Sequence, residues 1–210
     1  MNKFKLLSNF FLTANLALLL IIISIKFTVH FKLLYYFDIN HLNIPKESGF
    51  NINEIKINYN YLIDFITSKS NINFKIPTLP FSQEGRIHFY EVKHIFMKID
   101  YLFYISSIIG LITLYYLIKH KNFSILKYSS ITLLTIPILL FSTLFVNFDN
   151  AFTLFHKIFF NNDYWIFDVE KDPIIKILPE EFFLHCAILI NILIVFFSML
   201  CWIIYKRSSK

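Results

Sequence analysis

Two histidines stand out for the chemistry they could do, because each lies beside carboxylates in a polar stretch that borders a long apolar run. They are His88 and His156. An imidazole gains and loses a proton near neutral pH, and the hydrogen bond made by one ring nitrogen fixes the tautomer. Such residues indicate general acid–base catalysis. The alternative is that each histidine is a solvated or helix-capping residue at a membrane surface.

The stretch around His88, "FSQEGRIHFYEVKHIF", reads as the start of a helix. Spacings of three and four residues place Glu84, His88 and Glu91 on one helical face, and Arg86 is a nearby cationic donor. A metal site needs three closely spaced ligands, and we interpret the H-x-x-E pattern at 88–91 as no more than a possible half-site, so we predict no metal. The alternative for this segment is the solvated charged face of an interfacial helix.

The stretch around His156, "FHKIFFNNDYWIFDVEKDPIIKILPEEFF", occupies residues 155–183 between two apolar runs. Tyr164 and Trp165 are typical of the aromatic belt at a membrane surface. We find no serine nucleophile motif, and both cysteines lie at apolar positions, so no covalent protein nucleophile is predicted. The carboxylates within reach along the sequence are Asp149, Asp163, Asp168 and Asp172.

The elements that must position these residues are predicted to be membrane helices. The chain has 210 residues, of which 56% are hydrophobic and 19% aromatic, and this composition favours the membrane class. The first apolar run is too long for the core of a signal peptide, so we interpret it as an uncleaved anchor. Four segments reach or approach the roughly 20 residues that a bilayer core requires, namely 6–25, 101–118, 128–146 and 183–205.

The distribution of charge predicts the topology. The N-terminus, the loop 119–127 and the C-terminal tail carry eight basic residues and no acidic one, whereas the other polar segments hold all fourteen acidic residues. The positive-inside rule therefore predicts that both termini are cytoplasmic. The net charge of +6 reflects this inner face, so we expect no nucleic-acid partner.

The expected fold class is an α-helical integral membrane protein with four transmembrane helices and a small mixed α/β extracytoplasmic cap between the first two. In the cap, 51–68 is predicted to be a helix with Asn51 or Asn53 as its N-cap. Residues 71–81 are predicted to be an edge strand or an extended segment, because they contain two prolines. The predicted parts are 1–37, 38–100, 101–118, 119–127, 128–146, 147–182 and 183–210.

The two histidines are predicted to converge. The loop 119–127 is short, so the second and third spans should be antiparallel neighbours. His88 precedes the second span by about thirteen residues and His156 follows the third by about ten. Both therefore lie beyond the same pair of helix ends, where Glu91 and Asp149 or Asp168 could orient the rings.

Three motifs in this order resemble the bacterial lipoprotein intramolecular transacylase family. "EIKINYNYLIDFI" is similar to the family's helix with an Asn/Tyr-Tyr-Leu pattern, and "FSQEGRIHFYEVKHIF" is similar to Glu-x-x-x-His-x-x-Asp-Val-Lys. The third and most specific motif, from Phe155, resembles Phe-His-x-x-Phe-Phe followed by Trp, Asp and Leu-Pro-Glu-x-Phe-Phe. Glu91 departs from the pattern, since the family usually has Asp there.

The resemblance implies an acyltransferase of a bacterial plasma membrane that acts at the outer leaflet. Its substrate would be a diacylglyceryl-modified lipoprotein, and no cofactor would be needed. We expect a monomer whose other partners are membrane lipids. The implied catalytic residues are His88 and His156. The supporting or substrate-binding candidates are Glu84, Arg86, Glu91, Tyr59, Tyr61, Trp165 and Asp168.

Two other functions compete with this interpretation. A non-enzymatic accessory protein could present the outer segments to a partner, and it would need no histidine at the membrane rim. A haem or quinone protein would need histidines at matched depth within facing helices, and apart from His185 the predicted spans offer none.

Overall fold

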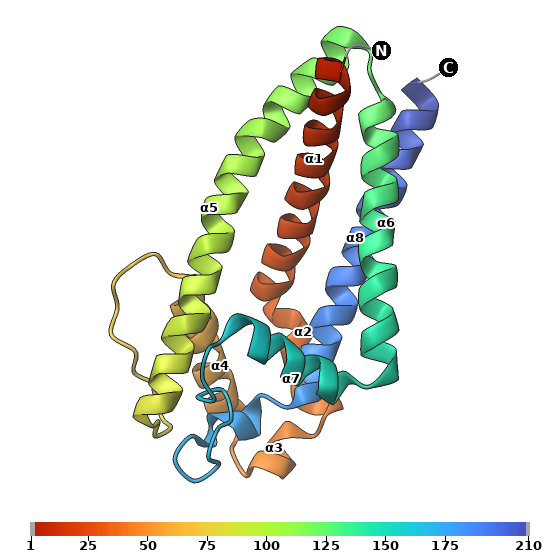
Figure 1. The fold of residues 1–210 in the computed structure, drawn as a ribbon. Helices are drawn as coiled ribbons and strands as arrows, with labels where there is room; N and C mark the ends of the chain where they lie inside the picture. The colour runs from red at the N-terminus through yellow and green to blue at the C-terminus, as the bar shows by residue number, and fades with distance from the viewer. Residues whose placement is uncertain (1–2, 209–210) are drawn as a thin grey trace. The chain divides into compact units, whose positions relative to one another are not determined.

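The computed structural model describes residues 3–208, without the side chains of residue 4 and residues 136–146. The described chain folds into helices joined by turns and irregular segments (Figure 1). In chain order the elements are α1 (Lys3–His30), α2 (Lys32–His41), α3 (Ile44–Ser48), α4 (Ile52–Thr67), α5 (Gln83–His120), α6 (Ser124–Val146), α7 (Phe148–Phe159), the 3₁₀ helix η1 (Pro173–Ile177) and α8 (Glu180–Ser208).

Three helices within the described residues are long and apolar enough to cross a membrane, namely α1, α5 and α8. They contain the predicted spans 6–25, 101–118 and 183–205. The fourth predicted span, 128–146, coincides with α6, but the side chains of residues 136–146 lie outside the described ones. The membrane crossing by α6 therefore stays a prediction.

One compact unit comprises Met1–Thr28, Ile99–Val146 and Ile188–Lys210. Within it, polar side chains join the long helices. The amide of Asn15 donates to the carbonyl of Ser106 at 3.1 Å, and the hydroxyl of Ser198 donates to the carbonyl of Ser130 at 2.8 Å. Such bonds are typical of helix contacts in a membrane, where apolar surface alone gives little drive for association.

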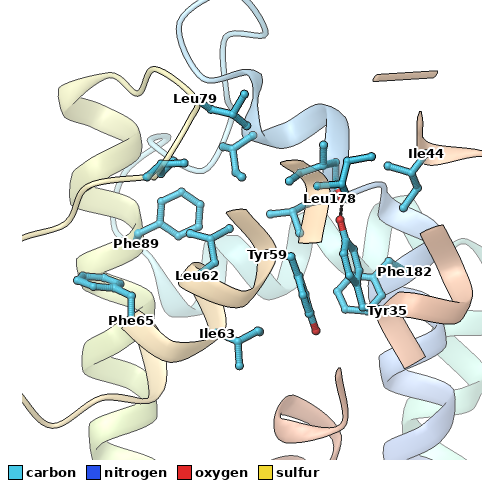
Figure 2. Close-up of a cluster of buried hydrophobic side chains, with 14 of the residues drawn as sticks. Tyr35, Ile44, Tyr59, Leu62, Ile63, Phe65, Leu79, Phe89, Leu178 and Phe182 are labelled. Atoms are coloured by element: carbon cyan, nitrogen blue, oxygen red, sulfur yellow. Dashed lines mark hydrogen bonds between the residues drawn. The ribbon is translucent and has the colours of Figure 1, made fainter. Parts of the chain in front are cut away.

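A second compact unit comprises Val29–Lys98 and Asn147–Ala187. Its core is built from α2, α4, η1, and the start of α5 and α8 (Figure 2). The rings of Tyr35 and Tyr59 stack with centroids 3.6 Å apart, and the hydroxyl of Tyr35 donates to the carbonyl of Ile177 at 2.6 Å. This core fixes the start of α5, the helix that carries His88.

The predicted helix over 51–68 is confirmed as α4. The Asn51 side chain accepts a hydrogen bond from the amide of Glu54 at 2.9 Å, so Asn51 is the N-cap. The predicted helix from residue 87 into the second span is also confirmed, because α5 runs without a break from Gln83 to His120.

The prediction of a mixed α/β cap is wrong, because the chain over residues 3–208 contains no strand. At the start of the predicted cap, residues 38–50 lie mostly in the helices α2 and α3. Residues 71–81 are irregular, and side chains of the flanking helices bind their backbone. The amide of Phe74 donates to the Tyr90 hydroxyl at 3.1 Å, and the amide of Lys75 donates to the Tyr61 hydroxyl at 2.6 Å. These helix side chains replace the strand partner that the pattern implied.

Candidate active site

The structure brings His88 and His156 together, so their predicted convergence is confirmed. His88 lies in the second turn of α5 and His156 near the end of α7. Their ring centroids are 6.0 Å apart, and the residues are 5% and 8% exposed. Both belong to the unit built from Val29–Lys98 and Asn147–Ala187. Two buried imidazoles at this distance can act on one substrate.

Helix α7 is strongly amphipathic, and its buried side is the one that carries His156. Its N-cap is Asn147, whose side chain accepts from the amide of Asn150 at 3.0 Å. His156 is the buried residue of this helix, whereas its large apolar neighbours are exposed. The exposed apolar residues are Leu154, Phe155, Ile158 and Phe159.

The tautomer of His156 is fixed by the backbone. Its Nδ1 lies 2.7 Å from the carbonyl oxygen of Phe152. A carbonyl can only accept, so Nδ1 carries the proton and Nε2 of the neutral ring carries the lone pair. The indole of Trp165 stacks on the ring with centroids 4.5 Å apart. His156 therefore presents Nε2 as a base, and a backbone carbonyl takes the role we had predicted for a carboxylate.

His88 lies among aromatic rings. The centroids of Phe160 and Phe167 are 4.7 and 5.5 Å from its own, and its Nδ1 is buried without a hydrogen-bond partner. Burial, together with the smaller effect of the nearby His156, lowers the pKa of His88 to about 4. Burial also lowers the pKa of His156, against the opposing effect of the Phe152 carbonyl. Both rings are consequently neutral at pH 7.

Glu91 is bound to the loop after α7. Its Oε1 accepts from the side-chain amide of Asn162 at 2.7 Å, and its Oε2 is buried without a partner. Glu91 thus holds the loop that leads to Trp165.

Sequence analysis expected that Asp168 could orient a histidine ring, whereas the buried carboxylate of this loop is Asp172. Asp168 is exposed and bonds within its own turn, to the amide of Glu170 at 3.0 Å and to Lys171. Asp172 is 3% exposed and accepts from the amide of Ser82 at 2.8 Å. Gly85 makes this approach possible, since a Cβ there would lie 2.3 Å from Asp172 Oδ1. A glycine in the first turn of a helix was the available signal.

The other predicted site residues lie in three places, namely the exposed first turn of α5, the core, and the surface of the His156 ring. Glu84 and Arg86 are exposed on the first turn of α5. Tyr59 and Tyr61 belong to the core, where Tyr59 stacks on Tyr35 and the Tyr61 hydroxyl accepts from the backbone. Trp165 packs directly on His156, and its indole N–H is buried without an acceptor. Among residues 3–208, no three His, Cys, Asp or Glu side chains gather closely enough to hold a metal ion.

A second pair, formed by His185 and Asp38, joins α2 to α8 and was missed by the sequence analysis. Nδ1 of His185 lies 2.9 Å from each carboxylate oxygen of Asp38, which is fully buried. The two residues are 147 positions apart, and neither lies in a motif. The signal present in the sequence was a charged residue among apolar neighbours in "LLYYFDIN".

Comparison with known proteins identifies relatives of the whole chain. A family model described as lipoprotein intramolecular transacylase Lit matches residues 10–183. No curated protein matches. The chain is similar to a solved structure of the membrane integral lipoprotein intramolecular transacylase Lit from Bacillus cereus, with 40% identity and a TM-score of 0.96 over 100% of this chain and 97% of that one.

Two further structures of the Bacillus cereus protein carry single histidine substitutions. The form with histidine changed to arginine is 39% identical, with a TM-score of 0.87 over 99% of this chain and 94% of that one. The form with histidine changed to alanine is 40% identical, with a TM-score of 0.88 over 97% and 92% of the two chains.

Proposed function

The chain belongs to the lipoprotein intramolecular transacylase family and is a membrane-integral acyltransferase, and on that premise we propose the reaction, its catalytic groups and its place in the membrane. The substrate is a lipoprotein with a diacylglyceryl group on its N-terminal cysteine. The acyl chain moves from the central glycerol ester to the α-amino group of the same cysteine. The product is an N-acylated lyso-form lipoprotein. The alternative of a non-enzymatic accessory protein does not fit this family.

The observation that carries the mechanism is the pair of neutral, buried imidazoles with centroids 6.0 Å apart. In this reaction the substrate supplies both the nucleophile and the electrophile. The protein then needs only to position them and to move protons. A covalent acyl-enzyme is unnecessary, which agrees with the burial of Cys201 and the apolar surroundings of Cys186.

We assign the role of base to His156. Its Nε2 takes a proton from the substrate ammonium, and the freed amine attacks the ester carbonyl carbon to form a cyclic tetrahedral intermediate. The bond between that carbon and the glycerol oxygen then breaks as the amide forms. As the amide forms, its nitrogen loses a second proton to an imidazole, and the leaving glycerol oxygen receives one proton from an imidazolium. Of the two protons that leave the ammonium nitrogen, one therefore ends on the glycerol hydroxyl and the other is released to solvent. His88 faces the same reacting atoms and shares this transfer.

The charge that develops on the carbonyl oxygen needs a hydrogen-bond donor. Sequence analysis offered Arg86, but its side chain is exposed. Trp165 is the better candidate, because its N–H is buried beside His156 and has no protein acceptor. A donor left unsatisfied by the protein is available to the substrate.

We place this site at the outer leaflet of a bacterial plasma membrane, with both termini in the cytoplasm. The exposed apolar face of α7 supports that depth, because such a face lies at the boundary between headgroups and acyl chains. A cysteine at Glu47 should react with an impermeant thiol reagent from outside, and one at Lys119 should not. The reverse pattern would contradict the topology.

The reaction is tested by mass spectrometry of a lipoprotein's N-terminal peptide from cells with and without the protein. We expect one acyl chain to move from glycerol to nitrogen at constant total acyl content. The His156→Gln and His88→Gln variants should each lower this product, whereas the matched control His120→Gln, exposed at the end of α5, should not. Full product from either active-site variant in normal amounts of protein would refute the role of that histidine.

A further inference from the structure

A pocket lies beside α5 that the proposed reaction does not use. It is lined by the turn 69–71 and by Tyr90, Lys93, His94 and Met97, and its volume is ≈ 170 Å³. On the same measure one water needs about 10–15 Å³, so the pocket holds a group much larger than a single water. All of its lining residues belong to the unit that carries the histidines.

The pocket and His88 lie on different faces of the same helix. The lining residues of α5 follow a spacing of three and four, which places them in one stripe. At 100° per residue, that stripe is centred roughly opposite the side that carries His88 and Glu91. A ligand in the pocket would therefore bind on the far side of α5 from the reacting groups.

The lining of the pocket is basic. It includes two lysines and a histidine, and none of the described residues that line it is acidic. Lys93 is only 5% exposed. Its ammonium donates to the carbonyl of Ser70 at 2.7 Å and lies 4.6 Å from the centroid of the Phe65 ring. A buried ammonium has no carboxylate partner in these contacts, so an anion in the pocket would be attracted to it.

The pocket wall is held in place before any ligand binds. The Ser70 carbonyl is fixed by Lys93, and the Tyr90 hydroxyl accepts from the amide of Phe74 at 3.1 Å. Tyr90 and Lys93 thus join the turn to α5 at both ends of the pocket. A site that is already formed binds its ligand without the entropic cost of ordering a loop.

The pocket lies at the depth along α5 where lipid headgroups are expected. Met97 and His94 precede the predicted span 101–118 by four and seven residues, which is roughly 6 and 10 Å along the helix axis. The headgroup layer on each side of a bilayer is roughly 5–8 Å thick.

We propose that this pocket binds the phosphate group of an anionic membrane phospholipid. The ammonium groups of Lys69 and Lys93 and the imidazole of His94 are the groups that hold the phosphate. Basic pockets beside membrane helices recognise headgroups in this manner. A zwitterionic phosphatidylcholine would bring a cationic choline into the same basic surroundings, so the pocket discriminates against it.

The test measures lipid retention by native mass spectrometry of the full chain in detergent micelles, with phosphatidylglycerol and phosphatidylcholine added at equal amounts. We expect preferential retention of one phosphatidylglycerol. Lys69→Gln should weaken that retention about fivefold, the effect of removing one lysine near a headgroup. Lys93→Gln should weaken it at least as much, and thermal melting will show whether that variant is folded. If it is not, Lys69→Gln and His94→Gln decide the result.

The matched control is Lys98→Gln, which removes an exposed positive charge on the same helix without altering the pocket lining. Equal loss of lipid in Lys98→Gln and Lys69→Gln would overturn the proposal, because the attraction would then be a general surface effect. Equal retention of both lipids by the unaltered protein would also overturn it. Displacement of phosphatidylglycerol by an equal concentration of inorganic phosphate would assign the pocket to a free phosphate instead. None of these outcomes depends on acyl transfer.

Discussion

The same compact unit contains two pairs with histidine, the buried His88 with His156 and the half-buried His185 with the buried Asp38, and the pairs differ in what each ring faces. His88 and His156 face each other among aromatic rings, and no carboxylate bonds to the His156 ring nitrogen that is held by Phe152. His185 faces the fully buried carboxylate of Asp38 at 2.9 Å. The first pair has an Nε2 lone pair available for substrate, whereas the second joins two helices. Proximity of histidine to an acidic residue in sequence therefore does not identify the catalytic pair.

The difference also shows how a histidine's tautomer can be fixed without adding charge. A carboxylate beside His156 would favour the imidazolium and so keep the base protonated. The backbone carbonyl of Phe152 fixes the same nitrogen as a donor while leaving the ring neutral. A neutral base is what the removal of a proton from a substrate ammonium requires.

The largest expected effect separates the two pairs by activity. His156→Asn keeps a short amide near the Phe152 carbonyl but removes Nε2, so we expect the rate of acyl transfer to fall by about 10²- to 10⁴-fold. His185→Asn should keep nearly the full rate per folded molecule. The measurement is acyl migration in purified protein, normalised to the folded fraction. Equal losses in both variants would remove the functional distinction between the pairs.

The next effect separates the pairs by stability. Asp38→Ala leaves the half-buried His185 facing a cavity, and the lost hydrogen-bond partner together with that cavity costs about 3 kcal/mol. The double variant Asp38→Leu with His185→Leu should recover part of this loss, because it removes both polar groups. Thermal melting in detergent measures both variants. If Asp38→Ala melts like the unaltered protein, the pair does not stabilise the unit.

A smaller effect is expected at the approach between Asp172 and α5. Gly85→Ala places a Cβ against the carboxylate that the Ser82 amide already holds, so overpacking should cost about 1–3 kcal/mol. It should also lower activity by displacing Phe167 from His88. Gly110→Ala is the control, since its Cβ would meet only the flexible end of Leu19. Similar melting temperatures for the two variants would argue against the Asp172 anchor.

The smallest expected effect is on the pH dependence of stability. The pKa of His88 is about 4 in the folded chain and about 6.5 in the unfolded chain, so below pH 6.5 the unfolded state binds the extra proton. Stability is therefore fully present above pH 6.5 and decreases as the pH falls toward 4. Between pH 6.5 and 5.5 the loss from His88 is about 1 kcal/mol. The melting temperature of the His88→Gln variant should therefore change less between pH 6.5 and 5.5 than that of the unaltered protein. An equal change in both proteins would contradict the desolvation of His88.

Sequence patterns predicted the features that arise from local periodicity and from loop length. The Asn51 cap, the continuous α5 and the meeting of His88 with His156 followed from spacing and from the short loop 119–127. At 71–81 the sequence left open an edge strand or an extended segment, and the strand did not form, because an extended segment with two prolines looks the same whether strands or side chains satisfy its backbone. Side-chain hydroxyls satisfied it here.

Local sequence patterns could not predict which side chains bind one another. Asp168 and Asp172 follow His156 by twelve and sixteen residues, and only the packing of the 167–172 loop against Gly85 makes the more distant Asp172 the buried one. Likewise, nothing in the sequence near Asp38 indicates His185, since their contact depends on how α2 packs against α8.

The unit that contains the active site is discontinuous, being made from Val29–Lys98 and Asn147–Ala187. A ribosome therefore releases His88 long before Asn147 and the α7 helix exist. During that interval α2, α4 and the first turns of α5 have no α7, no Trp165 and no Asp172 to pack against. Domains form from the N-terminus as synthesis proceeds, but this one must wait for two hydrophobic helices to be made between its halves. Truncated chains that end before residue 147 will consequently contain His88 without His156, so the proposed catalytic pair can form only after the second half of the unit has been made.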